Sequence, residues 1–192
     1  LDPADCGPAC IALSQDIQGQ TFDYPEEFFK EKVHAIRRPR PDEFQIKEAA
    51  EKIKSSKNPI IISGGGVFYS DATKELSSFA KKHNIPTTQT VMGYSSMKKD
   101  DPYFVGPIGG LGGKAANNLA KQTDLAIAVG TKLGDFTTGS WANFENPNFS
   151  LVSINVARFD ASKHMAQSVI GDAKVSLNEL SQTLGNWKAS EE

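Results

Sequence analysis

Short apolar runs alternate along this chain with segments of helical periodicity. The run Ile60 to Ile62 is apolar on both faces, which is typical of a strand in a parallel sheet covered by helices. Three glycines, Gly64, Gly65 and Gly66, follow it directly. The same criteria predict further strands at 9–13, 86–91, 125–129, 151–156 and 168–170.

Helical segments lie between these strands. The first is expected to run from Asp42, an N-cap with Gln45 as its capping-box partner, to about Ser55. A second should follow a cap at Ser70, a third should follow the glycine-rich stretch 105–113, and the last should follow 171–172. This alternation predicts an α/β fold: an open, mostly parallel sheet of five or six strands with helices on both faces. That is the Rossmann-like (DHS-like) arrangement of NAD- and FAD-binding domains.

Glycines at the strand ends allow several interpretations. Gly64 to Gly66 would suit a turn with positive φ, or a close approach of the backbone to a ligand or a neighbouring element. Ligands of such sheets bind beyond the carboxyl ends of the strands, so 64–66, 90–92 and 130–132 are expected to form one crevice.

A second glycine-rich stretch, 110–115, fits the loose nucleotide fingerprint, although no convincing strand precedes it. A helix start of this kind could also hold an anion. Asp135 and Asp172 follow strands and could be helix caps or ribose acceptors.

The first forty residues differ in composition from the rest. Residues 19–41 are rich in aromatic, charged and proline residues and are expected to form an extended interdomain connector. Its cluster Arg37, Arg38 and Arg40 could meet a phosphate, but a solvated linker face is the favoured interpretation. Because the chain begins at Leu1 in the middle of apparent structure, we expect a piece of a longer protein. The expected division is a remnant strand in 1–18, a linker in 19–41, a central domain in 42–187 and a disordered tail in 188–192.

Composition narrows the function classes. The 192 residues can bury one good core, and a net charge of −2 offers no basic field for nucleic acid and no membrane patch. No apolar run is long enough to cross a bilayer, which makes the cytoplasm the default compartment. Cys6 and Cys10 do not have the spacing of known dithiol motifs, and three scattered histidines make a metal site improbable. Because no nucleophile elbow, Walker loop or metalloprotease helix occurs, the residues favour a binding or scaffolding domain.

The order of motifs from about Asp42 to Leu184 resembles the central domain of thiamine-diphosphate enzymes of the acetolactate synthase and pyruvate oxidase group. The matching strings are Ile62-Ser-Gly-Gly-Gly-Val67, Thr90-Val-Met-Gly93, Val105-Gly-Pro-Ile-Gly109, Ala128-Val-Gly-Thr-Lys-Leu-Gly-Asp135 and Ile170-Gly-Asp172. Residues 7–16 resemble the last strand of the pyrimidine-binding domain that precedes it. Residues 15–18, 22–26, 37–41, 135–141 and 155–160 are similar to a branch of hydrolases that open a cyclic dione.

The resemblance implies properties of an intact enzyme that differ from those of this chain. The enzyme would use thiamine diphosphate and magnesium, act on a small cyclic dione, and form a homodimer or homotetramer. The activating glutamate and the Gly-Asp-Gly segment that hold the cofactor are not matched here, since Gly134-Asp135 continues to Phe136 and Gly171-Asp172 to Ala173. The chain alone is therefore expected to be non-catalytic and not to bind this cofactor.

Flavin-binding members of the group imply a set of FAD-binding positions. The corresponding residues are Gly64, Gly65, Gly66, Thr90, Met92, Gly130, Lys132 and Asp172. However, Lys132 replaces an arginine, and Ser153 stands where an acidic residue is expected, so the crevice is expected to be vestigial. The alternative is an FAD- or nucleotide-binding central domain of an acetolactate-synthase-like enzyme.

Overall fold

The computed structural model describes residues 1–190. It divides into two compact units, residues 1–37 and the chain from Arg38 onward, which are described separately.

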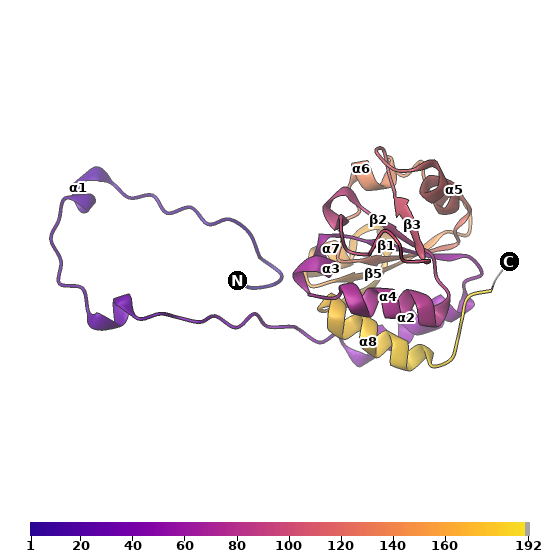
Figure 1. The fold of residues 1–192 in the computed structure, drawn as a ribbon, viewed down its shortest axis with the longest axis horizontal. Coiled ribbons are helices and arrows are strands. Elements are labelled where there is room, and N and C mark those ends of the chain that lie inside the picture. Colours follow the sequence, from indigo (N-terminus) through magenta and orange to yellow (C-terminus); the bar gives the residue numbers. More distant parts are fainter. Residues whose placement is uncertain (191–192) are drawn as a thin grey trace. The chain divides into compact units, whose positions relative to one another are not determined.

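The second unit is built on six parallel strands in the order β3-β2-β1-β4-β5-β6 (Figure 1). This confirms the predicted α/β class. The strand order reverses between β1 and β4, the point at which such sheets bind ligands. The strands are β1 (Pro59–Ser63), β2 (Thr87–Gln89), β3 (Phe104–Pro107), β4 (Leu125–Val129), β5 (Ser150–Asn155) and β6 (Gln167–Ile170).

Helices connect the strands. The α-helices of this unit are α2 (Glu43–Ser55), α3 (Gly65–Tyr69), α4 (Thr73–His83), α5 (Lys114–Gln122), α6 (Asp135–Thr138), α7 (Arg158–Ala161) and α8 (Ala173–Leu184). Two 3₁₀ turns, η2 (Val91–Gly93) and η3 (Lys163–Met165), lie after β2 and α7.

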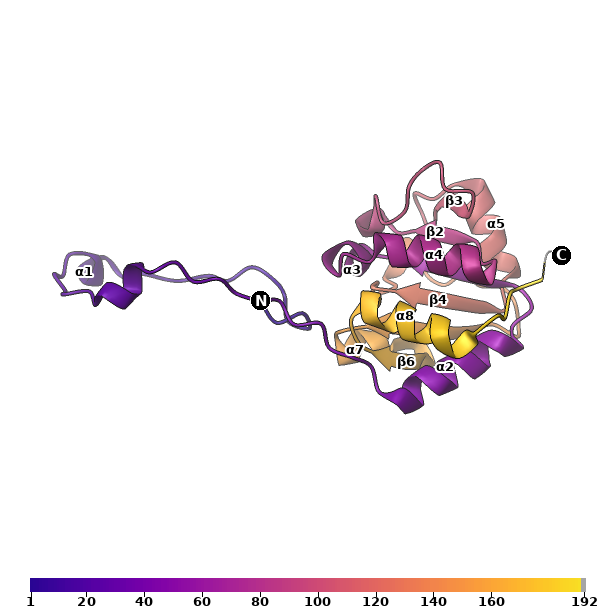
Figure 2. The same ribbon diagram turned by 60° about the horizontal axis from the view of Figure 1, so that its bottom comes forward.

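Alternate residues of the central strands enter two separate cores, because successive side chains of a strand point to opposite faces. Ile61 and Ile127 pack with the inner faces of α2, α4 and α8. Ile60 and Ile62 pack with α5 and the loop after β4. Figure 2 shows α8 between α2 and α4, in agreement with the contacts that α8 makes with both. Helices therefore cover both faces, as predicted.

Two predicted capping interactions are wrong in detail. Asp42 caps α2 by accepting a hydrogen bond from the Phe44 amide, but the Gln45 side chain accepts one from the Ile170 amide at 2.9 Å instead of closing a capping box. Ser70 does not cap the next helix. Helix α3 starts directly after Gly64, and Ser70 ends it.

The first unit does not contain the strand predicted at 9–13. It has one turn of helix, α1 (Gln15–Gln18), and a 3₁₀ turn, η1 (Glu26–Phe29). A strand needs a neighbour to pair its amides and carbonyls, and an apolar run cannot supply one by itself. The aromatic residues of the linker contact one another. The ring centroids of Tyr24 and Phe28 are 5.1 Å apart, and those of Phe28 and Phe29 are 5.3 Å apart.

The chain after α8 is held against α4, which differs from the expected disordered tail. The Ala189 amide donates to the carbonyl oxygen of His83 at 2.9 Å, and Ala189 is buried. The His83 ring is also buried, with Nδ1 at 2.8 Å from the Trp187 carbonyl oxygen and Nε2 at 3.1 Å from Ser181 Oγ. Residues 191–192 of the predicted tail lie outside the described residues.

His83 should make the stability of the chain fall in mild acid. Its burial lowers the pKa of the imidazole below the ordinary value of 6.5, and the nearby Lys82 ammonium lowers it further, against the Trp187 carbonyl, which raises it. The unfolded state therefore binds more protons, and the free energy of unfolding should decrease as the pH falls below about 6.5. Urea unfolding at several pH values, compared with the His83→Gln variant, measures this. If the free energy of unfolding had the same pH dependence in both proteins below pH 6.5, the role of His83 would be contradicted.

Candidate functional site

The three segments predicted to form one crevice do meet at the carboxyl edge of the sheet. The Gly64 amide donates to the carbonyl oxygen of Val129 at 2.8 Å, and the Gly66 amide donates to that of Gly130 at 2.9 Å. The Thr90 amide donates to the carbonyl oxygen of Ser63 at 2.9 Å. The ends of β1, β2 and β4 are thus bonded directly to one another.

Close backbone approach explains the glycines after β1. Gly64 has an ordinary φ of −113°, so positive φ is not the reason for a glycine there. A Cβ on Gly66 would lie 2.6 Å from the Cα of Gly130, and one on Gly64 would lie 2.5 Å from the Cβ of Thr131. Among Gly64, Gly65, Gly66 and Gly130, only Gly130 has the left-handed conformation, with a φ of +60°.

These contacts limit what the crevice can bind. A dinucleotide site uses free amides at the first strand-to-helix turn to hold the diphosphate. Here the amides of Gly64 and Gly66 already donate to carbonyl oxygens of the chain. The second glycine-rich turn is similar. The Gly110 amide donates to the carbonyl oxygen of Phe136, and the Gly113 amide donates to that of Pro107, at 2.8 Å each. Strand β3, which the sequence did not reveal, precedes that turn.

The remaining predicted positions have separate environments. Thr90 is buried and caps η2 by accepting from the Gly93 amide at 3.0 Å, whereas Met92 is exposed. The Lys132 ammonium is exposed and lies 3.9 Å from the Asp160 carboxylate, which also binds Lys163 at 2.6 Å. The charge of Lys132 is therefore partly balanced within the chain.

Ser153, the position where the resemblance places an acidic residue, lies inside a strand, and the assignment stays a prediction. Ser153 is buried in the middle of β5 and pairs with Ala128, whereas the strand ends at Asn155. The Asn155 amide donates to the Thr131 carbonyl oxygen at 3.2 Å, so Asn155 is the residue that faces the crevice segments.

Asp172 acts as a helix cap in this structure. One carboxylate oxygen accepts from the amides of Lys174 and Val175, and the other binds the Arg38 guanidinium at 3.0 Å. Arg38 also donates to the Ser70 carbonyl oxygen. The favoured interpretation of the arginines as a solvated face is therefore wrong for Arg38, which sequence alone could not pair with a residue 134 positions away.

Within residues 1–190, no group of three or more histidine, cysteine or acidic residues is placed to hold a metal ion. None of the helices described is long and apolar enough to cross a membrane.

Residues 46–180 match the family described as thiamine pyrophosphate enzyme, central domain. The chain belongs to this family. Solved structures show the same fold at low sequence identity. A putative thiamin diphosphate-dependent enzyme from Mycobacterium smegmatis superposes on 81% of this chain and 30% of its own with a TM-score of 0.64 at 21% identity. Benzoylformate decarboxylase from Polynucleobacter necessarius covers 92% of this chain and 32% of its own, with the same TM-score and identity.

Curated relatives are more similar in sequence. The chain is 47% identical, over its whole length, to 3D-(3,5/4)-trihydroxycyclohexane-1,2-dione hydrolase of Clostridium perfringens. Over 95% of its length it is 49% identical to the enzyme of that name from Clostridium botulinum. The chain spans only 30% of the length of the Clostridium perfringens enzyme and 28% of the length of the Clostridium botulinum enzyme.

The described residues do not fit the cofactor that the family name implies. Asp172 is fully engaged as a cap and ion pair, and Asp135 lies exposed in the first turn of α6. Neither belongs to a cluster of acidic ligands of the kind that magnesium and a diphosphate need.

Proposed function

We propose that this chain is the central domain of a thiamine-diphosphate-dependent hydrolase of myo-inositol catabolism. The parent enzyme opens the ring of trihydroxycyclohexane-1,2-dione to 5-deoxyglucuronate. Water cleaves the bond between the two carbonyl carbons, and its atoms complete a carboxylic acid at one carbon and an aldehyde at the other.

One observation carries this proposal. The similarity to the hydrolases extends over the whole chain, including the first forty-five residues, which lie outside the family match of 46–180. If the chain shared only the fold of its central domain with these hydrolases, the segment before that domain would have no reason to be similar to theirs.

The role of the domain in that enzyme is structural. Its strand ends are bonded to one another, and its glycines permit that packing, so the sheet acts as a rigid spacer between the catalytic domains. The subunits of the parent enzyme form a homodimer or homotetramer in the cytoplasm.

The full-length enzyme with thiamine diphosphate and magnesium should open the ring of the dione and should not condense pyruvate to acetolactate. Both products are measured in parallel reactions. Acetolactate formation without ring opening would overturn the proposal.

Added FAD should leave the melting temperature of the enzyme unchanged and the purified protein colourless. A ligand present at a hundred times its dissociation constant stabilises a protein by about 2.7 kcal/mol, which a thermal scan detects. A yellow protein, or a stabilisation of that size, would favour the nucleotide-binding alternative.

A further inference from the structure

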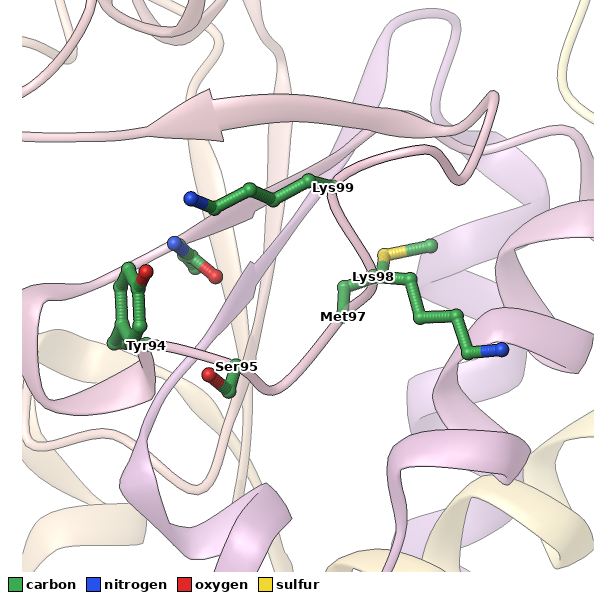
Figure 3. A pocket seen from close by; sticks show the side chains of 6 residues that line it. Tyr94, Ser95, Met97, Lys98 and Lys99 are labelled. Carbon is green, nitrogen blue, oxygen red and sulfur yellow. The ribbon is translucent and has the colours of Figure 1, made fainter.

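A hollow lies outside the predicted crevice, between the end of β2 and the loop that leads to β3 (Figure 3). Its volume is about 220 Å³, below the roughly 300–1,000 Å³ of pockets for drug-sized ligands. The hollow therefore suits a compact metabolite and is too small for a dinucleotide. It is lined by Gln89, Tyr94, Ser95, Met97, Lys98 and Lys99.

The amide of Gln89 is the unusual group in this hollow. Gln89 is 5% exposed, and its Oε1 has no hydrogen-bond partner within the described chain. An unpartnered buried oxygen of this kind destabilises the fold, and most buried polar groups in proteins have a partner. The oxygen itself is inaccessible in this conformation, but the last torsion of a glutamine is broad, so the amide can turn to present its N–H or its carbonyl oxygen to a ligand.

The hollow also carries positive charge. Neither Lys98 nor Lys99 forms an ion pair within residues 1–190. In Figure 3, Lys99 extends toward Tyr94, and its ammonium lies 5.7 Å from the centre of that ring, whereas Lys98 extends in the other direction. A single ammonium of this kind attracts an anionic group.

Buried contacts hold the loop in place. The hydroxyls of Ser63 and Ser96 are 2.6 Å apart, Ser77 donates to the Asp101 carboxylate at 2.5 Å, and Met97 is part of the core. The loop itself is therefore held in place, which lowers the cost of ordering it around a ligand, whereas the side chains of Tyr94, Lys98 and Lys99 are exposed.

We propose that this hollow binds a small oxyanion that carries hydroxyl groups. The anionic group lies at the Lys99 ammonium, and a hydroxyl of the same molecule pairs with the Gln89 amide. A sugar acid and a polyol phosphate share this chemistry. The site is independent of the reaction proposed for the parent enzyme.

Isothermal titration of the full-length protein with three probes tests the site. Glucuronate supplies a hydroxylated carboxylate, glycerol 3-phosphate a hydroxylated phosphate, and propionate an anion without hydroxyls. At least one of the first two should bind, and propionate should bind at least about fivefold more weakly because it cannot pair with Gln89 through a hydroxyl. The better of the first two identifies the anionic group.

Matched substitutions separate this site from any other. Gln89→Met and Lys99→Met should each weaken the affinity for the bound probe about tenfold. Lys99→Met should also make that affinity less dependent on salt concentration. Lys57→Met, which removes an exposed lysine that does not line the hollow, should bind like the wild type.

Retention of binding in both variants would place the ligand elsewhere and overturn the proposal, as would the absence of binding by all probes at millimolar concentration. Because Lys99 is exposed, its variant remains informative even if Gln89→Met does not fold.

Discussion

Replacing Gly66 by alanine should lower the free energy of unfolding of the chain by about 3 kcal/mol. In an ordinary helix this change stabilises by about 1 kcal/mol, because alanine is the better helix former. Here the new Cβ would lie 2.6 Å from the Cα of Gly130 and 2.9 Å from its carbonyl oxygen. Both are backbone atoms, so the ends of β1 and β4 would have to separate. Urea unfolding followed by tryptophan fluorescence measures the loss.

Gly134→Ala is the matched control. Gly134 has a φ of −70°, and no atom lies within 4 Å of the position that its Cβ would take. This variant should be as stable as the wild type or more stable by up to about 1 kcal/mol. If Gly66→Ala were equally stable, the strand ends would not be as tightly packed as the structure shows.

Replacing Arg38 by methionine should cost about 2 kcal/mol. Asp172 is buried, and without the guanidinium one of its carboxylate oxygens would lose its charged partner. The cost stays below that of a fully buried pair, because the Arg38 side chain is 34% exposed and solvent can replace part of the interaction.

Arg40→Met provides the comparison for Arg38. Arg40 also pairs with an acidic residue of α8, Glu179, at 2.7 Å, but its side chain is 78% exposed. Its loss should cost less than about 0.5 kcal/mol. Urea unfolding measures the free energy of unfolding of both variants. Equal decreases would mean that the Arg38–Asp172 pair contributes no more than a surface ion pair.

Much of the fold could be predicted because local patterns and tertiary structure agree. The run Ile60 to Ile62 is apolar on both faces and lies at the centre of the sheet, where both faces are covered. The helix from Asp42 to Ser55 follows from its cap and its apolar spacing. β3 gave no such signal, since its sequence, Phe104-Val-Gly-Pro107, contains a glycine and a proline and lies at a partly exposed edge.

The predicted crevice illustrates what sequence leaves open. Strand order brings Gly64 to Gly66 beside Gly130, and that juxtaposition could be predicted. Whether the amides of Gly64 and Gly66 point to a ligand or donate to carbonyl oxygens of β4 and its end depends on distances of a few tenths of an ångström, which no spacing rule specifies. The ligand-binding role of these residues, with Thr90, Met92, Lys132 and Asp172, stays a prediction. Gln89 and Lys99 were missed because a glutamine at the end of a strand and a lysine in a loop are individually ordinary.

The composition of β3 also bears on how copies of this domain can associate. An edge strand with free amides invites another chain to extend the sheet, which leads to aggregation. Pro107 has no amide to donate, Gly106 has a φ of +121°, and the register with β2 shifts after Thr87. A seventh strand added alongside β3 would find few evenly spaced hydrogen-bond partners. Continuous intermolecular sheets through the β3 edge are therefore expected to be disfavoured.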